Sequence, residues 1–215
     1  RPRAVPMARR ALLGLALCLR GAPRVAAAGC PSSAPPAWPV RFKILQRKVP
    51  ADDADCGRGT CSNVTAYYDW GRQANLIIDH RDGSPANSTL WDLELGSGHS
   101  YYIHPGLRQC MFHEFDVGIL RRSWLEGATF LGESFLNGRL CQVWTKDDFI
   151  DYYADAEDCT PVSWFFHTMR AWFHTIDYLE GEAVPDDNFF SPPEYCPNRT
   201  AGLDGLHHES PALVV

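Results

Sequence analysis

The stretch FLGESFLNGRLCQVWT, residues 130–145, carries the strongest local signal in this chain. The dipeptide Asn137-Gly138 separates two runs, residues 130–136 and 139–145, that are rich in apolar and β-branched or aromatic residues. Asn-Gly suits the two positive-φ positions of a type I′ turn, whose twist matches that of paired antiparallel strands. The stretch therefore predicts a β-hairpin with a two-residue turn.

Similar short runs, separated by turn residues, lie on both sides of this hairpin. They cover residues 40–49, 64–70, 75–79, 89–95, 100–104, 161–169 and 172–179. Residues 122–128 lack β-branched side chains and are expected to form a helical turn. About nine strands with little helix predict a mainly β protein built on an antiparallel sheet.

The first 28 residues have the features of a secretory signal peptide. Met7-Ala-Arg-Arg is followed by an apolar run at residues 11–19 and by three small residues, Ala26, Ala27 and Ala28. A cationic head, a short apolar segment and a small-residue exit are typical of such a leader, and cleavage is expected after Ala28. The apolar run is shorter than the roughly 20 residues that a membrane-spanning helix needs. Residues 1–6 precede the expected start at Met7.

This leader determines the predicted organisation and location. We expect upstream residues and signal peptide at 1–28, a disordered Pro/Ser/Ala-rich linker at 29–37, a single β domain at 38–196 and a flexible tail at 197–215. No second apolar span follows the leader, so the mature chain is expected to lack a transmembrane segment. The sequence predicts a secreted protein or a resident of an endomembrane lumen or vacuole.

The charge of the chain excludes one class of partner. The leader contains six arginines and no acidic residue, so its removal changes the formal charge from −6 to −12. A surface of that sign repels phosphate backbones. Nucleic acid is therefore not expected as a partner.

Seven cysteines follow the predicted cleavage point, and an oxidising compartment makes them candidates for disulfides. Cys30 lies beside the cleavage point and is expected to be the unpaired one. The six expected to form bridges are Cys56, Cys61, Cys110, Cys141, Cys159 and Cys196. Their connectivity cannot be deduced, because six cysteines pair in 15 ways. No pair has Cys-x-x-Cys spacing, which disfavours a zinc site.

Three tripeptides match the N-glycosylation acceptor Asn-x-Ser/Thr, and they begin at Asn63, Asn87 and Asn198. Behind a signal peptide, these three sites support the prediction of a glycoprotein.

Several motifs carry a resemblance to known families. They are FDVGILRRSWLEGATFLG from Phe115, NGRLCQVWTKDDFIDYY from Asn137, PVSWFFHT from Pro161 and VPDDNFFSPPEYC at residues 184–196. Over residues 38–196 they resemble an uncharacterised family of secreted plant and algal proteins, some of which carry the label glycosyl group transferase. More distantly, the order of these motifs is similar to ependymin-related proteins.

The ependymin resemblance implies a fold and a ligand. The fold would be a single, strongly curved antiparallel sheet or half-barrel, like that of bacterial lipoprotein carriers, enclosing an apolar pocket. The ligand would be a hydrophobic or amphipathic small molecule, and calcium is a further candidate. No other cofactor is expected.

The chain contains 7 Trp, 8 Tyr and 11 Phe, more rings than a thin sheet easily encloses. Candidates for lining a ligand pocket are Trp144, Tyr152, Trp164, Phe166 and Trp172, with Phe189 and Phe190 as a cap. Trp164 and Phe166 are two residues apart in a predicted strand and therefore share a face. In the alternative interpretation, all the rings form a core and the protein is a structural extracellular module without a ligand.

The densest acidic cluster lies at residues 147–158, and a solvated loop is its simplest explanation. An alternative is a carbohydrate-active enzyme that performs glycosyl transfer or hydrolysis with Asp148 and Asp151, since such enzymes use two carboxyl groups. A second alternative is a calcium site formed by Asp151, Asp155 and Asp158, because hard cations take several carboxylate oxygens. A smaller calcium candidate is Asp186-Asp187-Asn188.

Overall fold

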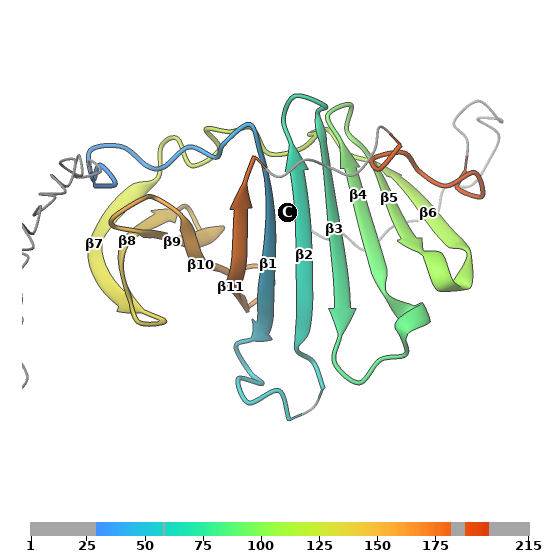
Figure 1. Ribbon diagram of the computed structural model, residues 1–215, viewed down its shortest axis with the longest axis horizontal. Coiled ribbons are helices and arrows are strands. Elements are labelled where there is room, and N and C mark those ends of the chain that lie inside the picture. Colours follow the sequence, from blue (N-terminus) through green and yellow to red (C-terminus); the bar gives the residue numbers. More distant parts are fainter. Residues whose placement is uncertain (1–28, 58, 182–187, 198–215) are drawn as a thin grey trace, which may run out of the picture.

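The structure is a computed structural model that describes residues 29–57, 59–181 and 188–197. Eleven strands form one antiparallel sheet in the order β6-β5-β4-β3-β2-β1-β11-β10-β9-β8-β7 (Figure 1). The strands are β1 (Arg41–Pro50), β2 (Ser62–Asp69), β3 (Ala74–Arg81), β4 (Leu90–Leu95), β5 (His99–His104), β6 (Gln109–Glu114), β7 (Thr129–Leu136), β8 (Arg139–Lys146), β9 (Ile150–Asp155), β10 (Pro161–Phe166) and β11 (Ala171–Glu180). The mainly β, antiparallel fold is confirmed.

The sheet is open and curved, with β6 and β7 at its two edges (Figure 1). Within the described residues, the only helical elements are two 3₁₀ turns, Ala86–Ser88 and Pro105–Leu107. The central strand β1 pairs with β2 on one side and with β11 on the other. All other neighbours follow each other in the chain, so the sheet is two antiparallel meanders joined at β1 and β11.

The nine expected strands are present, and the structure adds two that the sequence analysis did not predict, β6 and β9. β9 lies inside the acidic stretch that was expected to be a loop. Its apolar residues Ile150, Tyr152 and Ala154 are buried, whereas the acidic residues alternate with them on the other face. Residues 122–128 form consecutive turns rather than a helical turn.

The predicted hairpin is confirmed. β7 and β8 pair in antiparallel register from Thr129 opposite Thr145 to Leu136 opposite Arg139. Asn137 and Gly138 take φ values of 52° and 77°, which are the positive values that a type I′ turn requires.

A first hydrophobic core lies on one face of the sheet, called here the inner face. Its strand residues come from β1, β2 and β8–β11, and Trp124 and Leu125 from the turns before β7 cover them. Trp38 completes the cover, because its ring contacts the rings of Phe42, Tyr68 and Trp124 at centroid distances of 5.1–5.2 Å. The Trp38 indole N–H also donates to the Tyr152 hydroxyl at 3.2 Å.

A second core lies on the opposite, outer face and belongs to the other half of the sheet. It contains Leu76, Leu93 and Ile103 from β3, β4 and β5, together with Phe190 and Cys196. Residues 188–197 cover this face (Figure 1), and the Cys110–Cys196 disulfide ties them to β6. The two halves of one sheet therefore bury opposite faces.

Three disulfides are present: Cys30–Cys159, Cys56–Cys61 and Cys110–Cys196. The expectation that Cys30 is unpaired is wrong, and so is the pairing of Cys141, which is a free, fully buried thiol on β8. Residues 29–37 were expected to be a disordered linker. Instead, Cys30 is buried, and its N–H donates to the Ala156 carbonyl at 2.9 Å.

The predicted signal peptide at 1–28, the predicted tail beyond residue 197, the predicted acceptor Asn198 and the calcium candidates Asp186 and Asp187 lie outside the described residues. Within the part of the chain that the structure describes, no helix is long and apolar enough to cross a membrane.

The disulfide pattern predicts how thiols react in a chain that begins at residue 29. One thiol, that of Cys141, should react with Ellman's reagent after denaturation, and almost none should react in the native protein, because Cys141 is buried. Cys30→Ala should expose a second thiol, at Cys159. It should also destabilise the domain by about 3–5 kcal/mol, measured by urea unfolding, because the lost bridge spans 129 residues. Rapid labelling of one thiol in the native wild type would contradict this assignment.

Candidate functional site

Four of the predicted ligand-lining rings lie on the inner face, inside the first core. Trp144, Tyr152 and Trp164 are at most 7% exposed. The ring of Tyr152 stacks on that of Trp164 at 5.8 Å, and the ring of Phe166 contacts Trp164 at 6.4 Å. These side chains pack against one another as part of the first core.

The other three predicted rings lie elsewhere. Trp172 is on the outer face of β11, where it contacts the ring of Phe165 at 5.0 Å, because Ala171 and Phe173 take the inner positions. Phe189 and Phe190 belong to the second core, and Phe189 contacts Tyr67 at 4.8 Å. The seven predicted residues are therefore distributed over three places on two faces of the sheet.

The acidic candidates at residues 147–158 do not converge either. Asp148 is exposed in the turn between β8 and β9, whereas Asp151 lies on the outer face, with its Oδ2 atom 3.2 Å from His167 Nε2. Asp155 pairs with Arg139 at 3.4 Å, and the Asp158 carboxylate accepts from the Thr160 N–H at 2.8 Å. Within the described residues, no three His, Cys, Asp or Glu side chains are grouped as a metal site.

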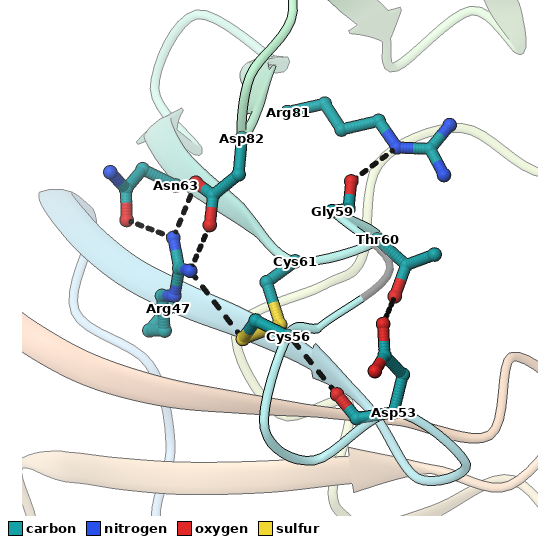
Figure 2. The surroundings of a disulfide bond; sticks show 9 residues. All are labelled: Arg47, Asp53, Cys56, Gly59, Thr60, Cys61, Asn63, Arg81 and Asp82. Atoms are coloured by element: carbon teal, nitrogen blue, oxygen red, sulfur yellow. Dashed lines mark hydrogen bonds and ion pairs between the residues drawn. A yellow bond between two sulfur atoms is a disulfide. The ribbon is translucent and has the colours of Figure 1, made fainter.

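Two glycosylation candidates lie where an attached glycan could project into solvent. Asn87 is exposed in the 3₁₀ turn Ala86–Ser88. Asn63 is exposed on β2, and its side-chain carbonyl oxygen accepts from Arg47 Nη1 at 3.2 Å, as Figure 2 shows. This hydrogen bond leaves the Asn63 amide nitrogen, the atom that would carry a glycan, available.

A different cluster emerges on the inner face of β3, β4 and β5. Asp92 and Glu94 are two residues apart on β4 and therefore point to the same side. Asp92 lies opposite Ile77 on β3 and Tyr102 on β5, and Glu94 lies opposite Asn75 and Ser100. The second core covers the outer face of β3, β4 and β5. These polar side chains therefore lie on the inner face, the same face that carries the first core over β1, β2 and β8–β11.

Asp92 and Glu94 form an acidic pair in which one carboxyl oxygen lacks a hydrogen-bond partner. The Asp92 Oδ1 atom is buried and has no hydrogen-bond partner. Burial, together with the neighbouring Glu94, raises the pKa of Asp92 to about 8. Burial also raises the pKa of Glu94, although a hydrogen bond from Asn75 Nδ2 at 2.8 Å opposes the rise.

A hollow of about 460 Å³ lies at the β5–β6 edge of the sheet; neither Asp92 nor Glu94 lines it, but Tyr102, which lies opposite Asp92, does. Its lining includes Tyr102, His104 and Met111 on the inner side and Arg108 and Tyr195 at the edge of the sheet. The His104 Nδ1 atom is buried without a hydrogen-bond partner, like the Asp92 Oδ1 atom. Buried polar atoms are normally satisfied. Of the eleven described side-chain atoms that are buried without a partner, these two lie on the inner face of β4 and β5, which makes this end of the face a candidate site for a polar ligand group.

The arrangement favours a positively charged or hydrogen-bond-donating group. A buried, unpaired carboxylate is costly, and the pair reduces that cost by binding a proton. An ammonium group placed between Asp92 and Glu94 would supply both the charge and the hydrogen bonds.

The sequence contained one signal of this acidic pair, the alternation of residues 89–95. Acids at alternate positions of a strand, however, normally indicate a solvent-exposed face.

The raised pKa of Asp92 predicts a pH-dependent stability. A carboxyl group whose pKa rises from 3.8 to about 8 on folding contributes stability that is complete below pH 3.8 and is lost as the pH rises through 8. Asp92→Asn removes this loss. Its melting temperature relative to wild type should therefore increase from pH 4 to pH 9, by roughly 3 °C or more.

Differential scanning fluorimetry from pH 4 to pH 9 measures this effect. Asp148→Asn, which removes an exposed carboxylate, is the control and should leave the pH profile unchanged. A constant difference between Asp92→Asn and wild type across this range would contradict a raised pKa.

Comparison with known proteins gives a family and distant structural similarities. A search of curated proteins found no match. The chain is similar to an uncharacterized conserved protein from Thermus thermophilus, with 8% sequence identity, a TM-score of 0.46 and coverage of 67% of this chain and 81% of that chain. A similarity of that size supports no argument about function. Residues 37–196 match a family described as a domain of unknown function, DUF8395, and the chain belongs to that family.

Proposed function

We propose that this protein binds an amphipathic ligand on the inner face of the sheet, with a cationic head group at Asp92 and Glu94. The observation that carries the proposal is the buried, unpartnered Asp92 Oδ1 atom at the polar end of an otherwise apolar row of side chains. Sequence composition and the ependymin resemblance point to the same class of ligand. They do not indicate the head group, which follows from the acidic pair alone.

The row runs across adjacent strands through directly opposed residues. It starts at Ile44 on β1, continues through Ala66 on β2 and Ile77 on β3, and reaches Asp92 on β4. Adjacent strands are about 4.7–4.9 Å apart, so the apolar part from Ile44 to Ile77 spans about 10 Å, and Asp92 lies about 14 Å from Ile44. Ala66 and Ile77 are only partly buried, and their exposed surface continues the first core toward the acidic pair.

The head group is expected to be an amine because of charge. An ammonium ion favours the ionised forms of both carboxyl groups, so binding would release a proton from Asp92 near neutral pH. A fatty-acid carboxylate at the same place would be repelled by Glu94. Affinity for an amine should therefore increase as the pH rises toward 8.

The three disulfides fit an oxidising compartment. Together with the leader and the glycosylation acceptors, they support secretion, or residence in an endomembrane lumen or vacuole, as the setting of this function. A soluble carrier in such a setting would shield an apolar chain from water.

Isothermal titration calorimetry with dodecylammonium, dodecanoate and dodecanol, each below its critical micelle concentration, tests the proposal. Dodecylammonium should bind at pH 8 at least ~10-fold more tightly than dodecanoate, because an ion pair with a partly buried acid is worth on the order of 1.4 kcal/mol or more. The variant Asp92→Asn/Glu94→Gln should lose this preference. Asp148→Asn/Asp151→Asn, which removes two acids outside the inner face, should retain it.

Equal binding of all three amphiphiles would show that the acidic pair does not recognise a head group. No binding of any of them would favour the structural module, in which every ring serves the core.

Carbohydrate chemistry is the second candidate function, and the same acidic pair would have to perform it. Two residues of one strand that share a face are about 6.6 Å apart at Cα, and glycoside hydrolysis needs two carboxyl groups roughly 5 to 9.5 Å apart. A carboxyl group with a pKa of about 8 is protonated at neutral pH and could act as a general acid. Asp148 and Asp151, the acids considered from sequence, lack this shared environment.

If this second function holds, the wild type should hydrolyse a nitrophenyl glycoside from a panel of common pyranosides. Asp92→Asn should then lower kcat about 100-fold or more, whereas Asp148→Asn should have no effect. Absence of turnover across the panel, measured by nitrophenolate absorbance, would count against the enzyme.

A further inference from the structure

The Cys56–Cys61 disulfide differs from the other two in the length of the loop that it closes. The two cysteines are five residues apart, whereas the other bridges span 129 and 86 residues. In the chain-entropy account, a bridge stabilises the folded state more when it closes a longer loop. The stability of the fold therefore depends least on Cys56–Cys61, and this bridge can open without releasing either end of the sheet.

Access to the two sulfur atoms of this bridge is unequal. Cys61 is fully buried immediately before β2, but Cys56 is partly exposed in the loop after β1. Cys56 also has a φ of 56°, a left-handed backbone conformation that is uncommon for a residue with a Cβ atom. Of the two cysteines, Cys56 is therefore the more accessible to an incoming thiolate.

A guanidinium group lies against the accessible sulfur. Arg47 Nη2 is 3.5 Å from Cys56 Sγ, and Figure 2 shows the guanidinium between this sulfur and Asp82. Asp82 holds Arg47 in place by a two-pronged ion pair, in which Nη1 donates to Oδ1 at 2.8 Å and Nη2 donates to Oδ2. A neighbouring cation lowers the pKa of a cysteine thiol, so Arg47 would stabilise a thiolate at Cys56.

The loop is held in place by bonds that do not involve the disulfide. The Asp82 N–H donates to the Cys61 carbonyl at 2.9 Å, and Arg81 Nε donates to the Gly59 carbonyl at 3.0 Å. The Thr60 hydroxyl donates to the Asp53 carboxylate (Figure 2). These contacts would keep the two thiols near each other after reduction, so that the bridge can form again.

From these observations we infer that Cys56–Cys61 is a thiol–disulfide exchange site that reacts with external dithiols, with Cys56 as the attacked sulfur and Arg47 as the residue that holds its thiolate. This role is independent of the proposed ligand site, which lies on the opposite face of the sheet.

The exchange proceeds in two balanced steps. A thiolate of the dithiol attacks Cys56 Sγ, the Cys56–Cys61 bond breaks, and Cys61 leaves with the bonding electron pair and takes up a proton. The second thiolate of the dithiol then attacks the dithiol's first sulfur, which is bound to Cys56 in the mixed disulfide, and the dithiol becomes a cyclic disulfide. Cys56 leaves as a thiolate beside Arg47, so the dithiol is oxidised and the protein gains two electrons.

Titration of the oxidised protein with dithiothreitol tests the site, with the other two bridges as internal references. Free thiols are trapped with iodoacetamide, the remaining bridges are reduced and labelled with N-ethylmaleimide, and peptides are quantified by mass spectrometry. Cys56 and Cys61 should open at a dithiothreitol concentration at least ~10-fold below that needed for the other pairs. Opening of all three pairs together, or of Cys56–Cys61 last, would overturn the inference.

Two further measurements test the assigned roles. Excess glutathione, a monothiol, should leave its adduct on Cys56, and an adduct on Cys61 would contradict the direction of attack. In the reduced protein, Arg47→Gln should slow iodoacetamide labelling of Cys56 about 10-fold at pH 7. It should also shift the pH at which the labelling rate is half-maximal to a higher value.

Matched variants separate charge from structure. Lys48→Gln, which removes the same charge from the next residue on the other face of β1, should leave the Cys56 profile unchanged. Arg47→Lys should restore most of the Cys56 labelling rate that Arg47→Gln loses. A profile that Arg47→Gln does not move would overturn the role of Arg47.

Discussion

The pairing of β1 with both β2 and β11 is the contact on which the rest of this structure depends. It joins two meanders that are each local in sequence, and it brings residues 41–50 next to residues 171–180. A bulge at Leu45/Gln46 interrupts the register with β11. Bulges bend a strand and increase its twist, so this junction is a natural place for the sheet to curve.

The consequence of this junction is a sheet that buries opposite faces in its two halves. Trp38, Trp124 and Leu125 cover the inner face over β1, β2 and β8–β11, and residues 188–197 cover the outer face over β3–β6. A row of opposed residues that begins in the first core therefore continues onto a face without a hydrophobic core. Asp92 and Glu94 lie at this boundary, and their raised pKa values follow from a position beside apolar surface rather than in open solvent.

The three disulfides also differ in role. Two of them attach segments that cover the sheet, and the third closes a short loop. Cys30–Cys159 and Cys110–Cys196 each attach a covering segment to the sheet, and Cys30 and Cys196 are buried. Cys56–Cys61 closes a short loop beyond the end of β1 and attaches no distant element. Arg47, whose Nη2 atom lies 3.5 Å from Cys56 Sγ, also contacts Asn63, a predicted glycan acceptor. A glycan at Asn63 would therefore lie beside the bridge that we infer to be exchangeable.

The sequence by itself determined the properties that depend on neighbouring residues. Strand positions, the Asn137-Gly138 turn and the antiparallel class follow from side-chain alternation and local backbone preference, which a short window contains. The same alternation was present in Ile150–Asp155, but its acidic residues masked a strand in which Ile150, Tyr152 and Ala154 are buried. Only the tertiary structure decided the partner of Cys30, the face on which Trp172 lies and the burial of Asp92. Each of these depends on register and curvature across strands far apart in the chain, which a short window of sequence does not contain.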